Sequence, residues 1–190
     1  MKNIIHSKSI LRDFTTICFI FLLIVTIINF VKFIEENNIL YLLSFCATFI
    51  ATLFYGIFFL QKKTNNSLRY IDWILTTPIL LLELCILSKI KNPYVITSIL
   101  LLNFSVFVFG WLGEIKKISR SLGCFLGFLP FIFLFYLFLS IGTYSYFIPF
   151  FIVVWTFYGI TYLIRHKNIR NLSYNLLDII SKGVFSILLF

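Results

Sequence analysis

Five charged residues lie inside long apolar stretches of the sequence, where a charge needs a physical explanation. They are Arg69, Asp72, Glu83, Asp178 and Lys182. If these stretches cross a membrane, each charge costs at least about 2.5–3.5 kcal/mol on insertion scales, so it persists only where it has a partner or a function. Each of the five is therefore a candidate for proton or ion chemistry.

Lys182 and Asp178 lie in the stretch LLDIISKGVFSILLF, four residues apart. On a helix this spacing places the carboxylate and the amine on one face, a single turn apart. Lys182 is too deep in the stretch for a simple interfacial lysine, although its long stem could still reach toward the membrane surface. The simplest interpretation is a buried cation with its own counterion.

The stretch RYIDWILTTPILLLEL, at residues 69–84, carries a second group of polar residues. Asp72, Thr76 and Glu83 are spaced i, i+4 and i+11, which is three helical turns with a drift of only about 20°. They therefore share one stripe, and the two carboxyl groups are about 16 Å apart along the axis. This is the layout of a relay, with a proton acceptor and a proton donor on either side of a central group.

The elements that must position these residues are membrane helices. Of the 190 residues 61% are hydrophobic, 20% are aromatic and only 12% are charged, which is outside the range of water-soluble domains. Apolar runs of about 20 residues recur along the chain, as expected for helices that cross a bilayer. We predict an all-α membrane protein with a single seven-helix domain over residues 1–190, its helices at roughly 10–34, 39–60, 69–88, 94–113, 121–140, 144–164 and 172–190.

Neither metal nor nucleic-acid binding is indicated. The four cysteines lie singly in apolar runs without CxxC spacing, so we interpret them as small buried residues and expect no metal site. The net charge is +9, but the cations are spread over separate connections at one face of the predicted bundle. Anionic lipid headgroups are a simpler partner for such a face than nucleic acid.

The two polar stretches resemble the third and seventh helices of the microbial rhodopsins, the family of bacteriorhodopsin and proteorhodopsin. The resemblance implies a seven-helix bundle around a retinal pocket, with all-trans-retinal bound covalently to Lys182 as a Schiff base. It further implies that Asp72 is the primary proton acceptor and counterion, Asp178 the second counterion, and Glu83 the proton donor. Arg69 would then gate the release side, and Thr76 completes an Asp-Thr-Glu pattern similar to that of proteorhodopsin.

A retinal pocket is also implied. Aromatic stripes are usually only core, but here the stripes on the third and sixth predicted helices match the family. The implied pocket residues are Tyr55, Trp73, Thr76, Thr77, Leu80, Asn103, Gly110, Trp155, Tyr158 and Tyr162. We expect Tyr55 and Tyr158 to bond Asp178, and Leu80 to give green absorption, because proteorhodopsins with leucine at this position absorb green light.

The sequence also departs from the family pattern. Gly159 stands where the sixth helix of the family has a proline after the pocket tyrosine, so we expect a weaker hinge there. The paired glutamates that release protons in bacteriorhodopsin have no counterpart, because the segment RHKNIRNLSYN before the last helix is basic. The histidine that partners the acceptor in proteorhodopsin is absent too, since His6 and His166 lie in connections.

The two faces of the predicted bundle differ in charge. The face with the N-terminus has eleven basic and two acidic residues, whereas the other has three basic and two acidic ones. Positive-inside counting places the N-terminus in the cytoplasm, but bacteriorhodopsin and proteorhodopsin have it outside. Both orientations of this integral membrane protein therefore remain open.

The function that the resemblance favours is a light-driven proton pump, which moves protons from the Glu83 side to the Asp72 side and is not an enzyme. A light-gated ion channel is the alternative. A photosensor is a third possibility, but sensors usually need a transducer surface or a soluble output domain, and we expect no such domain in this chain. A membrane protein without chromophore would need the two long motifs to match by chance. We expect membrane lipids as partners and a homo-oligomer, because family members commonly form trimers or pentamers.

Overall fold

The computed structural model describes residues 2–61, 66–143 and 145–189, without the side chains of residues 2–9. Its elements are α1 (Lys2–Glu36), α2 (Ile39–Leu60), α3 (Asn66–Leu87), α4 (Pro93–Glu114), α5 (Arg120–Ile141), α6 (Phe147–Leu163), α7 (Lys167–Asp178), the π-helix η1 (Ile179–Val184) and α8 (Phe185–Ile187). The last three form one continuous rod. The described residues therefore form seven rods, and the predicted all-α seven-helix architecture is confirmed.

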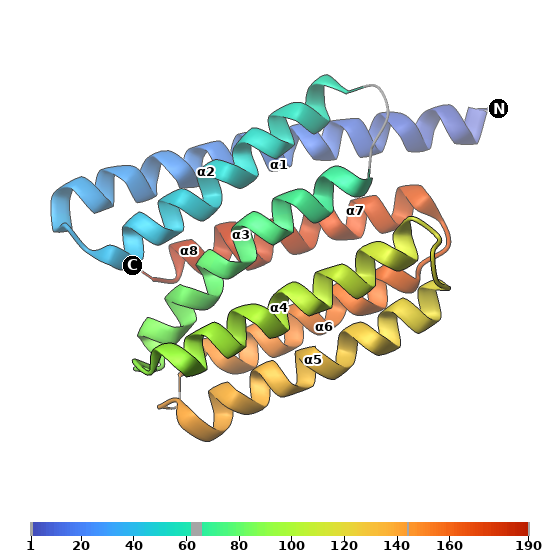
Figure 1. The fold of residues 1–190 in the computed structure, drawn as a ribbon. Helices are drawn as coiled ribbons and strands as arrows, with labels where there is room; N and C mark the ends of the chain where they lie inside the picture. Colours follow the sequence, from blue (N-terminus) through green and yellow to red (C-terminus); the bar gives the residue numbers. More distant parts are fainter. Residues whose placement is uncertain (1, 62–65, 144, 190) are drawn as a thin grey trace.

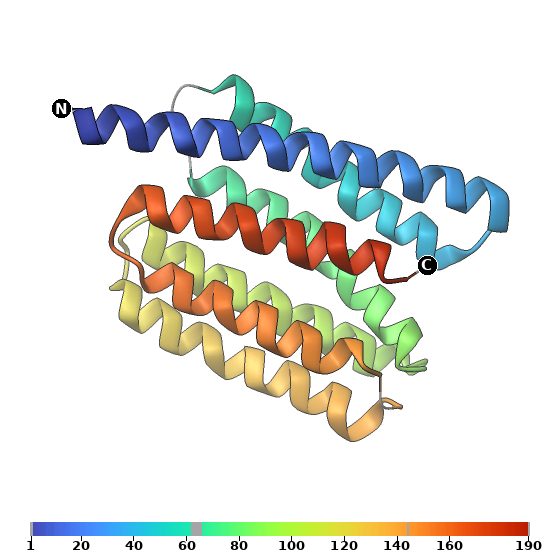
Figure 2. The same cartoon turned by 180° about the vertical axis from the view of Figure 1, so that it is seen from behind.

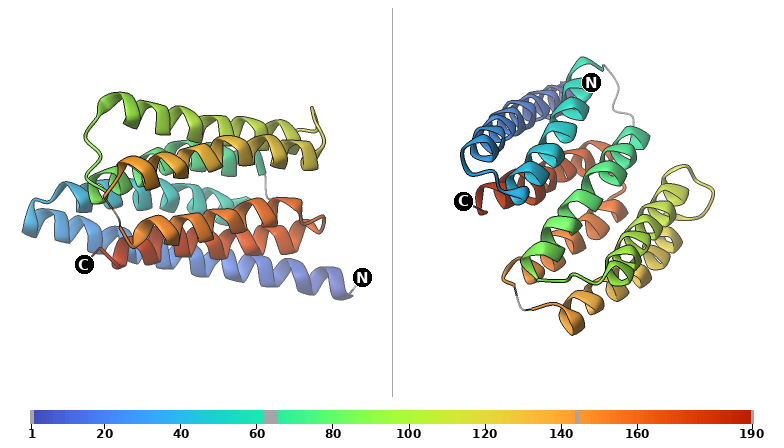
Figure 3. Two further views of the ribbon diagram at one scale, coloured as in Figure 1. Left: turned by 90° about the horizontal axis from the view of Figure 1, so that it is seen from below. Right: turned by 60° about the vertical axis from the view of Figure 1, so that its left-hand side comes forward.

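The rods close into a ring. Each helix packs against the next along the chain, and the rod from α7 to α8 returns to pack against α1, α2 and α6. Figures 1 and 2 show this rod running along α1, with the two chain ends at opposite ends of the bundle. Figure 3 shows the same arrangement of rods from two other sides. Side chains from the first, second, third and last rods can therefore meet inside the ring.

Local sequence signals set several helix starts. Asn38, Asn92 and Ser119 each cap a helix by accepting a hydrogen bond from a backbone N–H of the first turn. Pro93 follows Asn92 at the first helical position, where its missing N–H is no loss. These caps explain why the starts of α2, α4 and α5 agree with the prediction to within a residue.

Three predicted helix starts differ from the structure by more than a residue among the described residues, and the smallest difference is that of the third helix, which begins at Asn66 rather than 69. The first helix begins at Lys2 rather than near residue 10, and the last rod begins at Lys167 rather than near residue 172. In both places polar residues continue the helix beyond its apolar part, so hydropathy alone marks the boundary too late. The predicted start of the sixth helix at 144 and end of the seventh at 190 lie outside the described residues.

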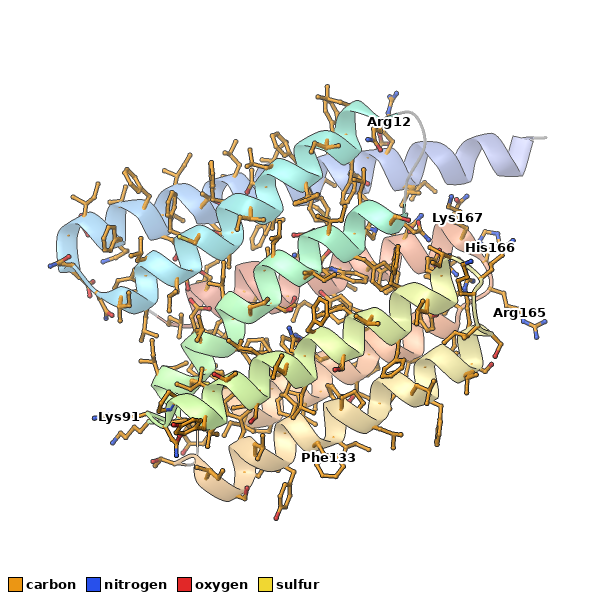
Figure 4. The ribbon with its side chains drawn as sticks, viewed as in Figure 1. Arg12, Lys91, Phe133, Arg165, His166 and Lys167 are labelled. Atoms are coloured by element: carbon orange, nitrogen blue, oxygen red, sulfur yellow. The ribbon has the colours of Figure 1, made fainter. Side chains whose placement is uncertain are left out.

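The outer surface of the bundle is apolar and its ends are basic. In the described part of the chain α1, α2, α3, α4 and α5 are long and apolar enough to cross a membrane, and α6 is a shorter apolar helix. Phe133, 62% exposed, points outward from α5 in Figure 4. Arg12, Arg165, His166 and Lys167 gather at one end of the bundle, and Lys91 lies at the other. This distribution is that of a membrane protein with charge at its two faces.

Candidate functional site

Lys182 lies at the centre of the bundle and pairs with two carboxylates. Its Nζ is 2.8 Å from Oδ2 of Asp72 and 3.6 Å from Oδ1 of Asp178, and all three side chains are at most 1% exposed. The predicted pairing with Asp178 is therefore present, but Asp72 is the closer partner. Lys182 lies in the π-helical segment η1, whose wider turn changes the direction of its side chain relative to an α-helix.

Asp178 is held by donors from three other helices. Tyr55 donates to Oδ2 at 2.8 Å, and Tyr158 and the indole nitrogen of Trp73 donate to Oδ1 at 2.7 and 3.0 Å. Arg69 adds an ion pair of 3.4 Å. The predicted bonds from Tyr55 and Tyr158 are confirmed. Both oxygens of Asp178 are thus occupied, and these donors hold its carboxyl group in one position.

One carboxylate oxygen of Asp72 accepts a hydrogen bond, and the other has no donor among the described residues. Oδ2 accepts from Lys182, whereas no donor among the described residues reaches the buried Oδ1. The Thr76 hydroxyl lies one turn further on, but it donates to the backbone carbonyl of Asp72 at 2.8 Å rather than to its side chain. Asp72 is thus the carboxylate of this site that is best placed to take up a proton.

Glu83 lies on the same stripe of α3 and is fully buried in the other half of the bundle. Ser44 of α2 donates to its Oε1, while Oε2 has no partner among the described residues. Its chain neighbours Leu84 and Cys85 belong to the apolar core, and no ion pair among the described residues includes Glu83. Burial of a charged carboxylate without a paired cation is costly, so these surroundings are compatible with the predicted role of Glu83 as a proton donor. The shared stripe of Asp72, Thr76 and Glu83 is confirmed, since all three are fully buried.

Arg69 extends from α3 toward α7. It donates to Oδ1 of Asn175 and lies 3.4 Å from both Asp178 and Tyr55, with its guanidinium 4.9 Å from the centre of the Phe58 ring. The sequence predicted a role for Arg69 on the release side but gave no indication of Asn175. An uncharged asparagine in a polar helix segment that also holds Asn168 and Asn171 gives no signal of a buried partner.

A second group of charges closes the Asp72 side of the bundle. Glu114, at the end of α4, accepts from Asn66 at 2.7 Å, from Arg120 at 3.2 Å and from Arg170 at 3.3 Å. Arg170 also donates to the carbonyl of Ile164. One carboxylate thus connects the ends of α3, α4, α5 and α7, although sequence analysis had counted these residues as surface charges.

A cavity lies between α3, α4, α5, α6 and the last rod, and Lys182 is among its lining residues. Predicted pocket residues that line it are Trp73, Thr77, Leu80, Asn103, Gly110, Trp155, Tyr158 and Tyr162. Tyr55 and Thr76 do not line it, and they act beside it through Asp178 and the backbone of Asp72. Lining residues that the prediction lacked include Tyr70, Phe107, Cys124, Phe128, Phe131, Tyr174 and Ser181. A cavity lined mostly by apolar and aromatic side chains, with the Lys182 amine among them, suits an apolar aldehyde bound to Lys182.

Glycines shape the walls of this cavity. Gly110, Gly127 and Gly159 come from α4, α5 and α6, so at these three positions no side chain projects into the cavity. A Cβ atom on Gly159 would lie 2.5 Å from the Phe128 ring, which therefore fills the space beside α6. At the position where the family has a proline, this protein therefore has a glycine with the Phe128 ring close to it. The four cysteines are free, and the described residues contain no cluster of metal-ligating side chains.

Seven rods around a buried lysine and two carboxylates define a membrane protein with an internal cofactor pocket, and comparisons with known proteins identify its family. The sequence matches the family model described as bacteriorhodopsin-like protein over residues 9–190. Among curated protein sequences, none matches the chain significantly.

Solved structures with the same fold include viral rhodopsin OLPVRII, with a TM-score of 0.87 and 28% identity over 94% of this chain and 95% of that one. Xanthorhodopsin, described as a light-driven ion pump with dual chromophore, gives 0.83 and 19% over 96% and 91%. The proton-pumping rhodopsin AR2 from the marine alga Acetabularia acetabulum gives 0.83 and 20% over 93% and 91%. The last two show likeness of fold alone.

The chain belongs to the bacteriorhodopsin-like family of microbial rhodopsins. Members of this family are integral membrane proteins that bind retinal, and they work as light-driven pumps and channels rather than as typical enzymes. The recognition of the family from the two polar stretches is therefore confirmed.

Proposed function

We propose that the protein is a light-driven proton pump that carries retinal on Lys182. The observation that supports this most strongly is the placement of Asp72 and Glu83 on one buried stripe of α3, with Nζ of Lys182 2.8 Å from Asp72. Retinal bound covalently at Nζ supplies the absorption of light and a change of shape that lowers the proton affinity of that nitrogen. All the proton transfers then use side chains of this chain.

The first transfer takes the proton of Nζ to Asp72. The distance of 2.8 Å to Oδ2 is a normal hydrogen bond, so Asp72 would be in position to accept a proton from Nζ. Both oxygens of Asp178 already accept hydrogen bonds from Tyr55, Tyr158, Trp73 and Arg69, whereas Oδ1 of Asp72 has no donor among the described residues. Asp178 therefore stabilises the positive charge at Nζ before the transfer and does not compete for the proton.

The second transfer returns a proton to Nζ from Glu83. The buried, uncompensated carboxyl group of Glu83 holds a proton at rest, and it lies on the opposite side of Lys182 from Arg69. A proton therefore enters from the Glu83 side and leaves on the Asp72 side. Protons move out of the cell if the N-terminus faces outside and into the cell if it faces the cytoplasm. Locating a tag on the N-terminus in the native membrane therefore determines the direction of transport.

A light-gated ion channel is the second candidate, and one observation favours it. Buried polar side chains gather where α1, α2 and the last rod meet: Asn29 donates to Ser186 at 2.5 Å and to Thr48 at 3.5 Å, and Thr26 pairs with Thr52 at 3.1 Å. In the described parts of α4, α5 and α6, by contrast, only Asn103 and Thr161 are buried polar residues. A polar seam of this kind could be hydrated when the bundle opens.

Photocurrents under voltage clamp separate the two candidates. A pump gives current of one sign at all accessible potentials, because light drives each transfer in a fixed order. A channel gives current that reverses sign at the equilibrium potential of the permeating ion. Reversal that follows the sodium or proton gradient would refute the pump.

We also propose that the apolar outer surface contacts lipid and other copies of the chain. Crosslinking in native membranes would detect such an assembly as a trimer or pentamer.

A further inference from the structure

Asn175 is a fully buried residue of α7 that connects four helices. Its Oδ1 accepts from Arg69 of α3 and lies 3.3 Å from the Tyr55 hydroxyl of α2, and its Nδ2 donates to the Thr15 hydroxyl of α1 at 3.0 Å. It lies seven residues before Lys182, on the Asp72 side of the site. No step of the proposed proton transfers uses Asn175 itself, so its role needs a separate explanation.

The orientation of the Asn175 amide is decided by Thr15. A threonine hydroxyl has one hydrogen, and that of Thr15 is directed to the backbone carbonyl of Leu11 at 2.8 Å. The Thr15 oxygen can therefore only accept from Asn175, which forces the NH2 group of the amide toward α1. The carbonyl oxygen then faces Arg69, as a guanidinium requires, since it has donors only. With the amide reversed, two donors would meet.

We propose that Asn175, oriented by Thr15 of α1, is the positioning residue that holds the Arg69 guanidinium beside Asp178. The inference rests on the proposed function only in its consequence for transport, because the hydrogen-bond relay itself is a property of the folded chain. It gives the first helix a part in the site: the Leu11 carbonyl orients Thr15, Thr15 orients Asn175, and Asn175 positions the Arg69 guanidinium beside Asp178.

The position of Arg69 matters because it contributes to the electrostatic field at Asp72. The charged groups that face this region are Lys182 and Asp178 of the last rod and Arg69 of α3, with the hydroxyls of Tyr55 of α2 and Tyr158 of α6 around Asp178. Without the Asn175 oxygen, the hydrogen bonds that Arg69 keeps among the described residues are the two of 3.4 Å to Tyr55 and Asp178, beside its contact with the Phe58 ring. Arg69 then spends part of its time further from Asp72, which loses a stabilising cation.

Thr15→Val is the sharpest test, because valine has nearly the same shape and removes only the hydroxyl. Thr16→Val is the matched control: Thr16 donates in the same way to the carbonyl four residues earlier, but this hydrogen bond is exposed, and the Asn175 amide bonds Thr15 instead. Two readouts report on Arg69 without any transport measurement. They are the guanidinium 15N resonances, assigned among the five arginines by Arg69→Lys, and the pH midpoint of the colour change of the retinal-bound protein.

We expect Thr15→Val to shift the Arg69 resonances and to raise the pH midpoint by about 0.5–1 unit, and Asn175→Leu to raise it by about 1–2 units. Thr16→Val should match the wild type. A Thr15→Val protein that is indistinguishable from Thr16→Val in both readouts, or a midpoint that moves to lower pH, would overturn the proposal.

Asn175→Asp keeps the inference testable if Asn175→Leu does not fold. An aspartate carries acceptors on both oxygens, so it needs no partner to orient it toward Arg69. We expect Thr15→Val to leave the Arg69 resonances unchanged in this background, and a further shift there would count against the relay. If the wild type gives no light-driven pH change while these results hold, the proposed pump is wrong and the positioning role stands.

Discussion

Replacement of Glu83 by glutamine tests the donor role in the proposed pump. Glutamine has the shape of glutamate and can still accept a hydrogen bond from Ser44, but it carries no transferable proton. Glu83 is about 16 Å from Asp72 along α3, and Nζ of Lys182 is hydrogen-bonded to Asp72. A proton that returns from Glu83 to Lys182 therefore travels on the order of 10 Å. Without a built-in donor it must come from water at the membrane face.

The size of the effect follows from the usual contribution of a positioned acid. General acid catalysis is worth about 10²- to 10⁴-fold, so we expect Glu83→Gln to slow reprotonation of Lys182 by at least about 100-fold, or roughly 2.7 kcal/mol in the barrier. The rate should also become dependent on external pH, falling about tenfold per unit, because the proton concentration in water now limits the step. In the wild type the rate should be nearly independent of pH.

Flash photolysis of the retinal-bound protein measures this rate directly. Glu114→Gln is the control, since Glu114 is a partly buried carboxylate at the opposite face and should leave reprotonation unchanged. A small weak acid such as azide should restore the rate of Glu83→Gln, because its neutral form can carry a proton into the bundle. A Glu83→Gln protein with the wild-type rate and pH profile would refute the donor role.

Three further changes test other parts of the site. Lys182→Ala should abolish colour on addition of retinal, which absorption spectroscopy detects; a coloured variant would contradict the attachment at this residue. Leu80→Gln should move the absorption maximum toward the blue, because it places a dipole on the cavity wall, and an unchanged maximum would count against that placement. Gly159→Ala should lower the thermal stability of the pigment by about 1–3 kcal/mol, because its Cβ would lie 2.5 Å from Phe128; Phe128→Ala in the same chain should relieve the loss.

Much of the site could be predicted because a charge in an apolar run is conspicuous. Lys182, Asp72 and Glu83 stand out for their cost in a membrane, and a helical period places the two carboxyl groups on one stripe. The bonds of Tyr55 and Tyr158 to Asp178 came from the family resemblance. In each of these cases a strong local signal was available, and the structure brings the residues together.

Other features had no such signal. Asn175 and Thr15 are uncharged and 160 residues apart, so neither composition nor spacing pairs them. The cluster around Glu114 depends on how four helix ends meet, which helical periodicity does not determine. The π-helical turn at Lys182 also leaves no mark in the pattern of apolar residues. What sequence analysis lacked was the packing of helices against one another, which decides the partners of uncharged polar groups.

Light-driven pH change in vesicles of known protein orientation tests the central claim most directly. The retinal-bound chain is illuminated with green light while external pH is followed with and without a protonophore. The proposed pump predicts a sustained pH change that the protonophore abolishes, that Asp72→Asn eliminates, and whose sign corresponds to movement from the Glu83 side to the Asp72 side. A coloured protein that completes its photocycle without any pH change would contradict proton pumping.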